Sequence, residues 1–198
     1  MTKIIGVSGS HGTGKTCTLD NIAKVQSKDP EIVVDDFKVS RAILEEMKCT
    51  LDQATATSKL MKVYQSRVLD VKIHRDLHVL RNIVVSTTPI NFLVDRSPAD
   101  VWAYTKLWAS KNKVSNSWFA EFTKKCIKAI EQYDKIILFP IGKIPFIDDG
   151  VRAKEDTQQC INDYIITFLD ASEIKYHTVE SVTVEDRTKE IISIIGGL

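Results

Sequence analysis

The sequence predicts an α/β fold, in which a mainly parallel five-stranded sheet carries helices on both faces. Short apolar runs alternate with longer stretches of helical periodicity, and the chain has no internal repeat. Most of the apolar runs are nearly continuous in Ile, Val, Leu and Phe, which is typical of strands buried on both faces. Strands that alternate with helices are joined by right-handed crossovers, and such connections favour a parallel sheet. At 198 residues the chain is expected to form a single domain, residues 1–198.

The elements follow in order from the apolar patterns. Strands are predicted at residues 3–8, 31–35, 90–95, 135–140 and 175–179. Helices are predicted where apolar residues recur on one face, as over residues 60–71, 119–133 and 160–169. A last helix is predicted to begin after Thr183, which can cap it while Asp186 reaches back. Because parallel sheets bind ligands beyond the carboxyl ends of their strands, we expect the site there.

The composition is that of a soluble globular protein. With 27 basic and 26 acidic residues, the net charge neither favours nor excludes a polyanionic partner. Four cysteines, at 17, 49, 126 and 160, form no CxxC pair and are interpreted as reduced thiols in an intracellular protein. The sequence shows no signal peptide and no apolar run of about eighteen residues, so we expect a cytoplasmic protein that does not enter the membrane.

The stretch GVSGSHGTGKTCTL, residues 6–19, lies between the first predicted strand and a helix. Gly9, Gly14, Lys15 and Thr16 match the pattern G-x-x-x-x-G-K-[ST], which cradles nucleotide phosphates with inward-turned amides and a helix start. We expect Lys15 to reach the β- and γ-phosphates of ATP and the Thr16 hydroxyl to bind Mg²⁺. The loop residues expected to contact the nucleotide are Ser10, His11, Gly12, Thr13, Gly14, Lys15, Thr16 and Cys17.

The position of this motif predicts a three-layer P-loop NTPase fold with a lid segment; its alternative is a glycine-rich turn with an incidental lysine. The lid is expected at about residues 141–156, a loop that contains Gly142 and Gly150 and follows a predicted strand. Arg152 is expected to swing over the phosphates and stabilise charge on the transferring group while the lid excludes water. The alternative is a plain surface loop in which Arg152 is solvated.

The stretch NFLVDRSPADVWAY, residues 91–104, is predicted to be a strand ending in Asp95 and a helix capped by Ser97. Asp95 is expected to hold Mg²⁺ through water, and Arg96 to steady the acceptor or a phosphate. Tyr104 is expected on the substrate side. The alternative is a salt-bridged pair of Asp95 and Arg96 that ends a buried strand.

The stretch EIVVDDFKVSRAIL, residues 31–44, is predicted to be a strand that ends in Asp35 and Asp36, next to the phosphate loop in the sheet. A carboxylate there could orient an acceptor hydroxyl or accept its proton. Arg41, one helical turn further, could contact the acceptor. The alternative is that each aspartate only caps the following helix.

Three stretches together, GSHGTGKT, DRSPADVWAY and IPFIDDGVR, resemble the P-loop kinases of the ribosylnicotinamide kinase type. These are the kinase domains of bifunctional NAD-salvage regulators, with related phage and bacterial nucleoside and nucleotide kinases. The DRS triplet is also similar to the acid-Arg-Ser motif of deoxynucleoside kinases. The resemblance implies that Lys15 and Thr16 serve the ATP phosphates and Mg²⁺. It also implies that Asp95 is a metal-side or acceptor-side carboxylate, Arg96 an acceptor or phosphate contact, and Arg152 the lid arginine.

One departure from that family concerns the catalytic base. Many relatives carry a glutamate a few residues before the arginine of the second helix, whereas DDFKVSR here has Lys38 nearby and aspartates further back. The base is therefore left open among Asp35, Asp36 and Asp95.

The sequence thus predicts an ATP- and Mg²⁺-dependent kinase that transfers the γ-phosphate of ATP to a nucleoside- or nucleotide-like acceptor, as a monomer or homodimer. Residues 101–130 carry six lysines against one acid, Glu121, and all three tryptophans, at 102, 108 and 118. Basic residues interleaved with aromatics suit single-stranded or duplex DNA, so a polynucleotide kinase is an alternative. The simpler interpretation is a solvated helix face above core tryptophans. A second alternative is an ATPase switch without a small-molecule acceptor.

Overall fold

The computed structural model describes residues 3–26, 31–83, 90–144 and 155–197. Within these ranges the chain forms a five-stranded sheet in which every pairing is parallel. The strands are β1 (Lys3–Ser8), β2 (Ile32–Asp35), β3 (Asn91–Asp95), β4 (Lys135–Leu138) and β5 (Tyr176–Thr178), in the spatial order β2-β3-β1-β4-β5. The predicted fold class and all five predicted strands are confirmed, with ends that differ by one or two residues.

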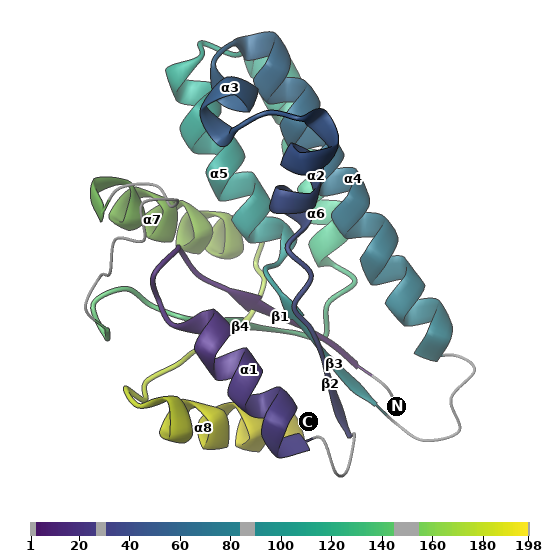
Figure 1. Ribbon diagram of the computed structural model, residues 1–198, viewed down its shortest axis with the longest axis vertical. Coiled ribbons are helices and arrows are strands. Elements are labelled where there is room, and N and C mark those ends of the chain that lie inside the picture. Colours follow the sequence, from purple (N-terminus) through teal and green to yellow (C-terminus); the bar gives the residue numbers. More distant parts are fainter. Residues whose placement is uncertain (1–2, 27–30, 84–89, 145–154, 198) are drawn as a thin grey trace.

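Helices cover both faces of the sheet, as Figure 1 shows. They are α1 (Lys15–Val25), α2 (Val39–Met47), α3 (Leu51–Thr55), α4 (Ser58–Ile83), α5 (Pro98–Lys111), α6 (Asn116–Ile130), α7 (Glu155–Ala171) and α8 (Val184–Gly196). On one face α1 and α8 pack against the sheet through side chains such as Leu19, Ile22 and Ile191. On the other face α4 to α7 bury a larger core, to which Ile136 and Leu138 of β4 contribute. Three layers result, with the sheet in the middle.

The helices α2 and α3, with parts of α4, α5 and α6, form an arm that extends away from the sheet (Figure 1). In α4, Met61, Tyr64 and Val68 are buried, as their spacing predicts. Leu60, which we expected on the same face, is 42% exposed, so that part of the prediction is wrong. Among the described residues, no helix has the length and apolar character needed to cross a membrane.

The order of the strands corrects one prediction. The sequence led us to expect that the strand ending in Asp35 lies directly beside the strand that leads into the phosphate loop. In the structure β3 lies between them, because it pairs with β1 on one side and with β2 on the other. Asp95, at the end of β3, is therefore the strand-terminal carboxylate next to β1, where it lies opposite Val7.

Candidate functional site

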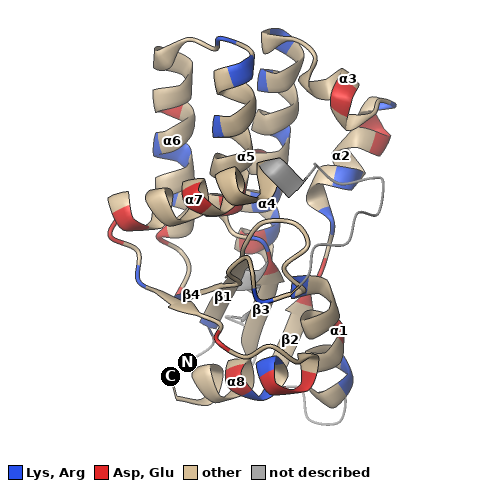
Figure 2. Ribbon diagram, turned by 90° about the vertical axis from the view of Figure 1, so that its left-hand side faces the viewer, with Lys and Arg blue, Asp and Glu red and all other residues tan. Residues whose placement is uncertain are grey.

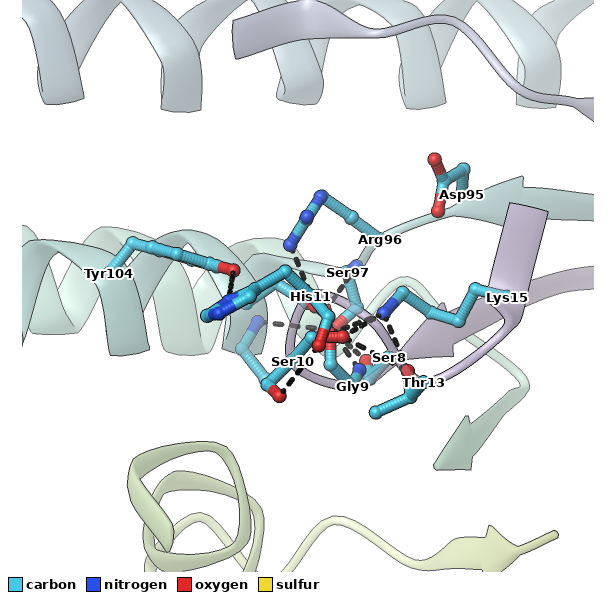
Figure 3. Close-up of polar contacts among 12 residues, drawn as sticks. Ser8, Gly9, Ser10, His11, Thr13, Lys15, Asp95, Arg96, Ser97 and Tyr104 are labelled. Atoms are coloured by element: carbon cyan, nitrogen blue, oxygen red, sulfur yellow. Dashed lines mark hydrogen bonds and ion pairs between the residues drawn. The ribbon is translucent and has the colours of Figure 1, made fainter. Parts of the chain in front are cut away.

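The phosphate loop connects β1 to α1, and its lysine is folded back into it. Lys15 Nζ donates to the carbonyl oxygens of Gly9 at 2.6 Å and Ser10 at 2.5 Å, and to Thr13 Oγ1 at 3.1 Å (Figure 3). The Lys15 side chain is buried in this position. Gly9 has φ 146°, a conformation that side chains rarely adopt, and an added Cβ would lie 2.6 Å from the Phe139 carbonyl oxygen. The loop therefore requires glycine at position 9. It also holds the Lys15 ammonium against its own carbonyl oxygens.

The phosphate loop is also held by Arg187 of α8, a residue that the sequence analysis did not single out. Arg187, in the first turn of α8, is buried and donates to the Thr13 carbonyl oxygen at 3.3 Å and to the Thr183 carbonyl oxygen at 3.2 Å. Burial lowers the pKa of its guanidinium. An added Cβ on Gly14, which has φ 80°, would collide with the Arg187 guanidinium. The only sequence signal for this contact was the position of Arg187 four residues after the helix cap Thr183.

The start of α5 is tied to the same loop by a capping box. Ser97 Oγ accepts from the amide of Ala99 at 3.1 Å, and the amide of Ser97 donates to Asp100 Oδ2 at 2.9 Å. The other oxygen of the fully buried Asp100 accepts from the amide of Gly9 at 3.2 Å. Ser8 Oγ also donates to Ser97 Oγ at 2.7 Å. The expected cap at Ser97 is confirmed, and Asp100 is a further site residue that we had not singled out.

Asp95 is the buried carboxylate of the site. Its side chain is 6% exposed, and Oδ2 accepts from Lys38 Nζ at 2.7 Å. Oδ1 is buried and has no hydrogen-bond partner among the described residues. Burial alone would raise the pKa of Asp95, but Arg96, Lys15 and Lys38 together hold it below its ordinary value. The alternative of a direct Asp95–Arg96 salt bridge is not what the structure has, since the close cation on Asp95 is Lys38.

This arrangement fits a magnesium ion carried by a nucleotide. Mg²⁺ prefers oxygen ligands and is held by one or two protein side chains together with substrate phosphates, not by an all-protein cage. Asp95 offers a carboxylate oxygen that has no hydrogen-bond partner within the described ranges, and Thr16 is exposed in the first turn of α1. Within the part of the chain that the structure describes, no cluster of three or more His, Cys, Asp or Glu side chains could hold a metal alone.

Arg96 and Tyr104 lie together beside the loop (Figure 3). Arg96 adopts φ 66°, and its guanidinium lies 5.1 Å from the centre of the Tyr104 ring and 3.4 Å from Asp100 Oδ1. Desolvation opposes its charge, but Tyr104, Asp100 and Asp95 raise the pKa of Arg96 above its ordinary value. The Tyr104 hydroxyl is 3.2 Å from Nδ1 of His11 in the loop. The structure thus brings together three predicted site residues, Arg96, Tyr104 and His11, and the Arg96 guanidinium among them is permanently charged.

The predicted site residues around the end of β2 differ in their surroundings, since Asp35 is bound by another side chain whereas Asp36 and Arg41 are exposed. Asp35 is held by Arg75 of α4, whose Nη2 lies 2.5 Å from Oδ1 and 2.6 Å from Oδ2. The Arg75 guanidinium also lies over the Phe37 ring at 3.9 Å. Asp36 is exposed, and so is Arg41 in α2. Neither aspartate is the cap of α2, because the N-cap residue is Lys38.

The lid is described only at its two ends. Arg152 and Gly150 lie outside the described residues, so their predicted roles stay predictions. Lys143, near the first end, forms an ion pair with Glu180 at 2.8 Å. Gln158, near the second end, donates through Nε2 to the His11 carbonyl oxygen at 2.7 Å, which ties α7 to the phosphate loop.

The lysine-rich helices α5 and α6 carry basic residues along the arm, as Figure 2 shows. Trp102 is buried and donates through Nε1 to Thr123, so it belongs to the core. Trp108 and Trp118 are half-buried, and lysine ammonium groups lie 4.7 Å and 5.9 Å from their ring centres. These positions favour the interpretation of a solvated helix face above packed aromatics over a platform for stacked bases.

A protein-family model described as AAA domain matches residues 4–187. No curated protein sequence matches the chain. Among solved structures, the fold resembles "NadR protein in complex with NR" (TM-score 0.68, 18% identity) and "NadR protein in complex with NAD and AMP-PNP" (TM-score 0.64, 16% identity). Both similarities cover 98% of this chain, but only 50% and 48% of the NadR chains, so this chain spans about half their length.

A third similar structure is deoxyadenosine kinase from M. mycoides with bound dCTP. It has a TM-score of 0.66 and 13% identity, and the similarity covers 98% of this chain and all of that one. The predicted resemblance to P-loop kinases of the ribosylnicotinamide kinase type is thereby confirmed at the level of the fold. The chain shares the fold of these structures, and its phosphate loop, strand-terminal Asp95 and the following Arg96 lie at one edge of the sheet.

Proposed function

Since this chain belongs to the AAA domain family over residues 4–187, we propose that it is an ATP-dependent kinase. The kinase moves the γ-phosphate of ATP to a hydroxyl or phosphate of a nucleoside- or nucleotide-type acceptor. The observation that carries this proposal is Asp95, a buried carboxylate within electrostatic reach of both Lys15 and Arg96. One of its oxygens has no hydrogen-bond partner in the part of the chain that the structure describes. A cradle for phosphates, an anionic oxygen ligand and a fixed cation at one edge are the parts that phosphoryl transfer requires.

The loop residues bind and orient the triphosphate. The amides of residues 9–16 and the start of α1 favour negative charge, and Lys15 turns from its loop carbonyls toward the phosphate oxygens. Thr16 and Asp95 would hold Mg²⁺, which neutralises charge on the phosphates when it is bound. Arg96 stabilises charge on the transferring group, since its guanidinium stays protonated at every working pH. Positioning and charge stabilisation supply most of the rate.

On the acceptor side we place Asp95, Arg96 and Tyr104. Asp35 is occupied by Arg75 and Asp36 is exposed, so Asp95 is the carboxylate that we propose at the reacting centre. The names of the similar structures support a nucleoside-like acceptor, since one is a complex with NR and another is a deoxyadenosine kinase. The NadR chains are twice as long as the matched part, so only transfer to a nucleoside-like acceptor is carried over.

The proposal is tested with γ-labelled ATP and a panel of nucleosides, nucleoside monophosphates and short single-stranded and duplex DNA. We expect labelled product with a nucleoside or a monophosphate, and no product from Lys15→Met. Label on DNA alone would establish the polynucleotide kinase, for which the lysines of α5 and α6 are the supporting feature. Release of phosphate that no acceptor stimulates would instead favour an ATPase switch.

A further inference from the structure

Lys38 is the feature of the site that the proposed chemistry leaves unused. It stands in the segment between β2 and α2, where its carbonyl oxygen accepts from the amides of Arg41 and Ala42 and its backbone caps the helix. The segment DDFKVSR that contains Lys38 is also where the sequence departs from the pattern of the ribosylnicotinamide kinase type. The structure shows where the ammonium goes: it binds Asp95, 57 residues away along the chain.

The ion pair joins a partly exposed lysine to a buried aspartate. Lys38 is 34% exposed along its side chain, whereas Asp95 is 6% exposed at the end of a central strand. Nζ lies 2.7 Å from Oδ2, and Oδ1 of the same carboxylate is left without a hydrogen bond among the described residues. The carboxylate therefore has one oxygen covered by a tethered cation and one oxygen available for another positive group.

The other two cations near Asp95 are anchored elsewhere. Lys15 Nζ is held by the carbonyl oxygens of the phosphate loop, and the Arg96 guanidinium lies between Asp100 and Tyr104. Within the described part of the chain, the Lys38 ammonium forms no hydrogen bond or ion pair other than the one with Asp95. A lysine on a flexible four-carbon stem is the cation of the three that can leave without disturbing the loop or α5.

We propose that Lys38 is an internal competitor for the metal-binding carboxylate: its ammonium occupies Asp95 before nucleotide binds and withdraws when the metal–nucleotide complex arrives. Two positive groups on one buried carboxylate repel each other, so each weakens the binding of the other. The proposal rests on the proposed function through the role of Asp95 toward the metal.

Binding of Mn²⁺ tests the proposal without any turnover. Free Mn²⁺ is measured by electron paramagnetic resonance during titration of the protein with saturating ADP present. We expect Lys38→Met to bind Mn²⁺ about tenfold more tightly than the wild type, and Lys38→Arg to stay close to the wild type because the competing charge is kept. Lys59→Met, which removes an exposed lysine from the first turn of α4, is the matched control and should leave the affinity unchanged.

Asp95→Asn separates this proposal from the proposed function. If Asp95→Asn weakens Mn²⁺ binding while Lys38→Met equals the wild type, Lys38 is not a competitor and the role of Asp95 toward the metal stands. If Asp95→Asn leaves Mn²⁺ binding unchanged, both assignments are overturned. The proposal requires in addition that Lys38→Met has no effect in the Asp95→Asn background, because the competition needs the carboxylate.

A measurement on the wild type guards against misfolded variants. Acetylation of Lys38 by a brief pulse of acetic anhydride is quantified by mass spectrometry in ADP with Mg²⁺ and in ADP with EDTA. We expect Lys38 to be labelled at least several-fold faster with Mg²⁺, while the labelling of Lys59 does not change. Equal or slower labelling of Lys38 with Mg²⁺ would contradict the proposal.

Discussion

The carboxylate of Asp100 accepts a hydrogen bond from the amide of Gly9 at 3.2 Å, which joins the helix after β3 to the first glycine of the phosphate loop. The same side chain accepts from the amide of Ser97 at 2.9 Å and so completes the cap of α5. One fully buried carboxylate thereby sets both the start of the loop and the start of the helix that carries Tyr104. Asp100 therefore links the phosphate loop to α5, the helix on which we propose that the acceptor is contacted.

Removing that carboxylate should therefore weaken both the fold and the site. Asp100→Ala leaves the buried amides of Gly9 and Ser97 without their acceptor, and we expect the free energy of unfolding to fall by about 1–3 kcal/mol. Urea unfolding measures this loss, and calorimetry should show weaker ADP binding in the same protein. Asp70→Ala, on the exposed surface of α4, is the control and should change stability by less than about 0.5 kcal/mol.

Lys15 should matter for turnover much more than for stability. Lys15→Met keeps most of the side-chain volume but removes the ammonium that we expect on the β- and γ-phosphates. The rate of phosphoryl transfer should fall by roughly a hundredfold or more, while the melting temperature stays close to that of the wild type. Lys189→Met, an exposed lysine of α8, should behave as the wild type in both measurements. Full activity in Lys15→Met would refute its assignment.

Arg187 should support nucleotide binding from beneath the loop. Its guanidinium bonds to the Thr13 and Thr183 carbonyl oxygens at once, a geometry that the single ammonium of lysine does not reproduce. We expect Arg187→Met and Arg187→Lys both to weaken ADP binding, Arg187→Met by about tenfold, as hydrogen bonds to a charged group are worth about 1.5–3 kcal/mol. Isothermal titration calorimetry measures this. Unchanged affinity in both variants would show that the loop does not depend on Arg187.

Glu190 should make stability depend on pH in the acid range. Burial opposes its charge, but the amides of Glu180 and Ser181 donate to its carboxylate at 3.0 and 2.9 Å and bring its pKa below the ordinary 4.5. A carboxyl with a lowered pKa stabilises the fold above its unfolded value, and this contribution is lost as the pH falls below it. The stability difference between the wild type and Glu190→Gln should therefore shrink as the pH falls below 4.5. A difference independent of pH down to acid unfolding would contradict this assignment.

The fold could be predicted from local patterns because its central strands, such as β1 and β4, are almost entirely buried. Apolar runs rich in Ile, Val, Leu and Phe marked β1 to β4, and the caps at Ser97 and Thr183 marked the starts of α5 and α8. The short helix α3 was not predicted, although Thr50 and Gln53 form a capping box there. The order of the strands was not available from the sequence either. It depends on which apolar faces pack together, and the wrong order placed Asp35 too close to the loop.

The site could be predicted only where its residues are neighbours in the chain. The motif fixed Gly9, Lys15 and Thr16, and the strand end fixed Asp95, because each follows from a local pattern. Contacts between distant segments were missed. Arg187 meets Thr13 across 174 positions, and Lys38 meets Asp95 across 57. Such pairs depend on how the strands and helices pack together, so they cannot be predicted from the spacing of residues in the sequence.

Transfer of labelled phosphate from γ-labelled ATP to a nucleoside or nucleoside monophosphate tests the central claim most directly. The wild type in Mg²⁺ should give a labelled acceptor, and both Lys15→Met and Asp95→Asn should give little or none while remaining folded. Wild-type protein that binds ATP yet labels no acceptor in the panel, nucleoside or nucleotide, would contradict the assignment of this chain as a kinase.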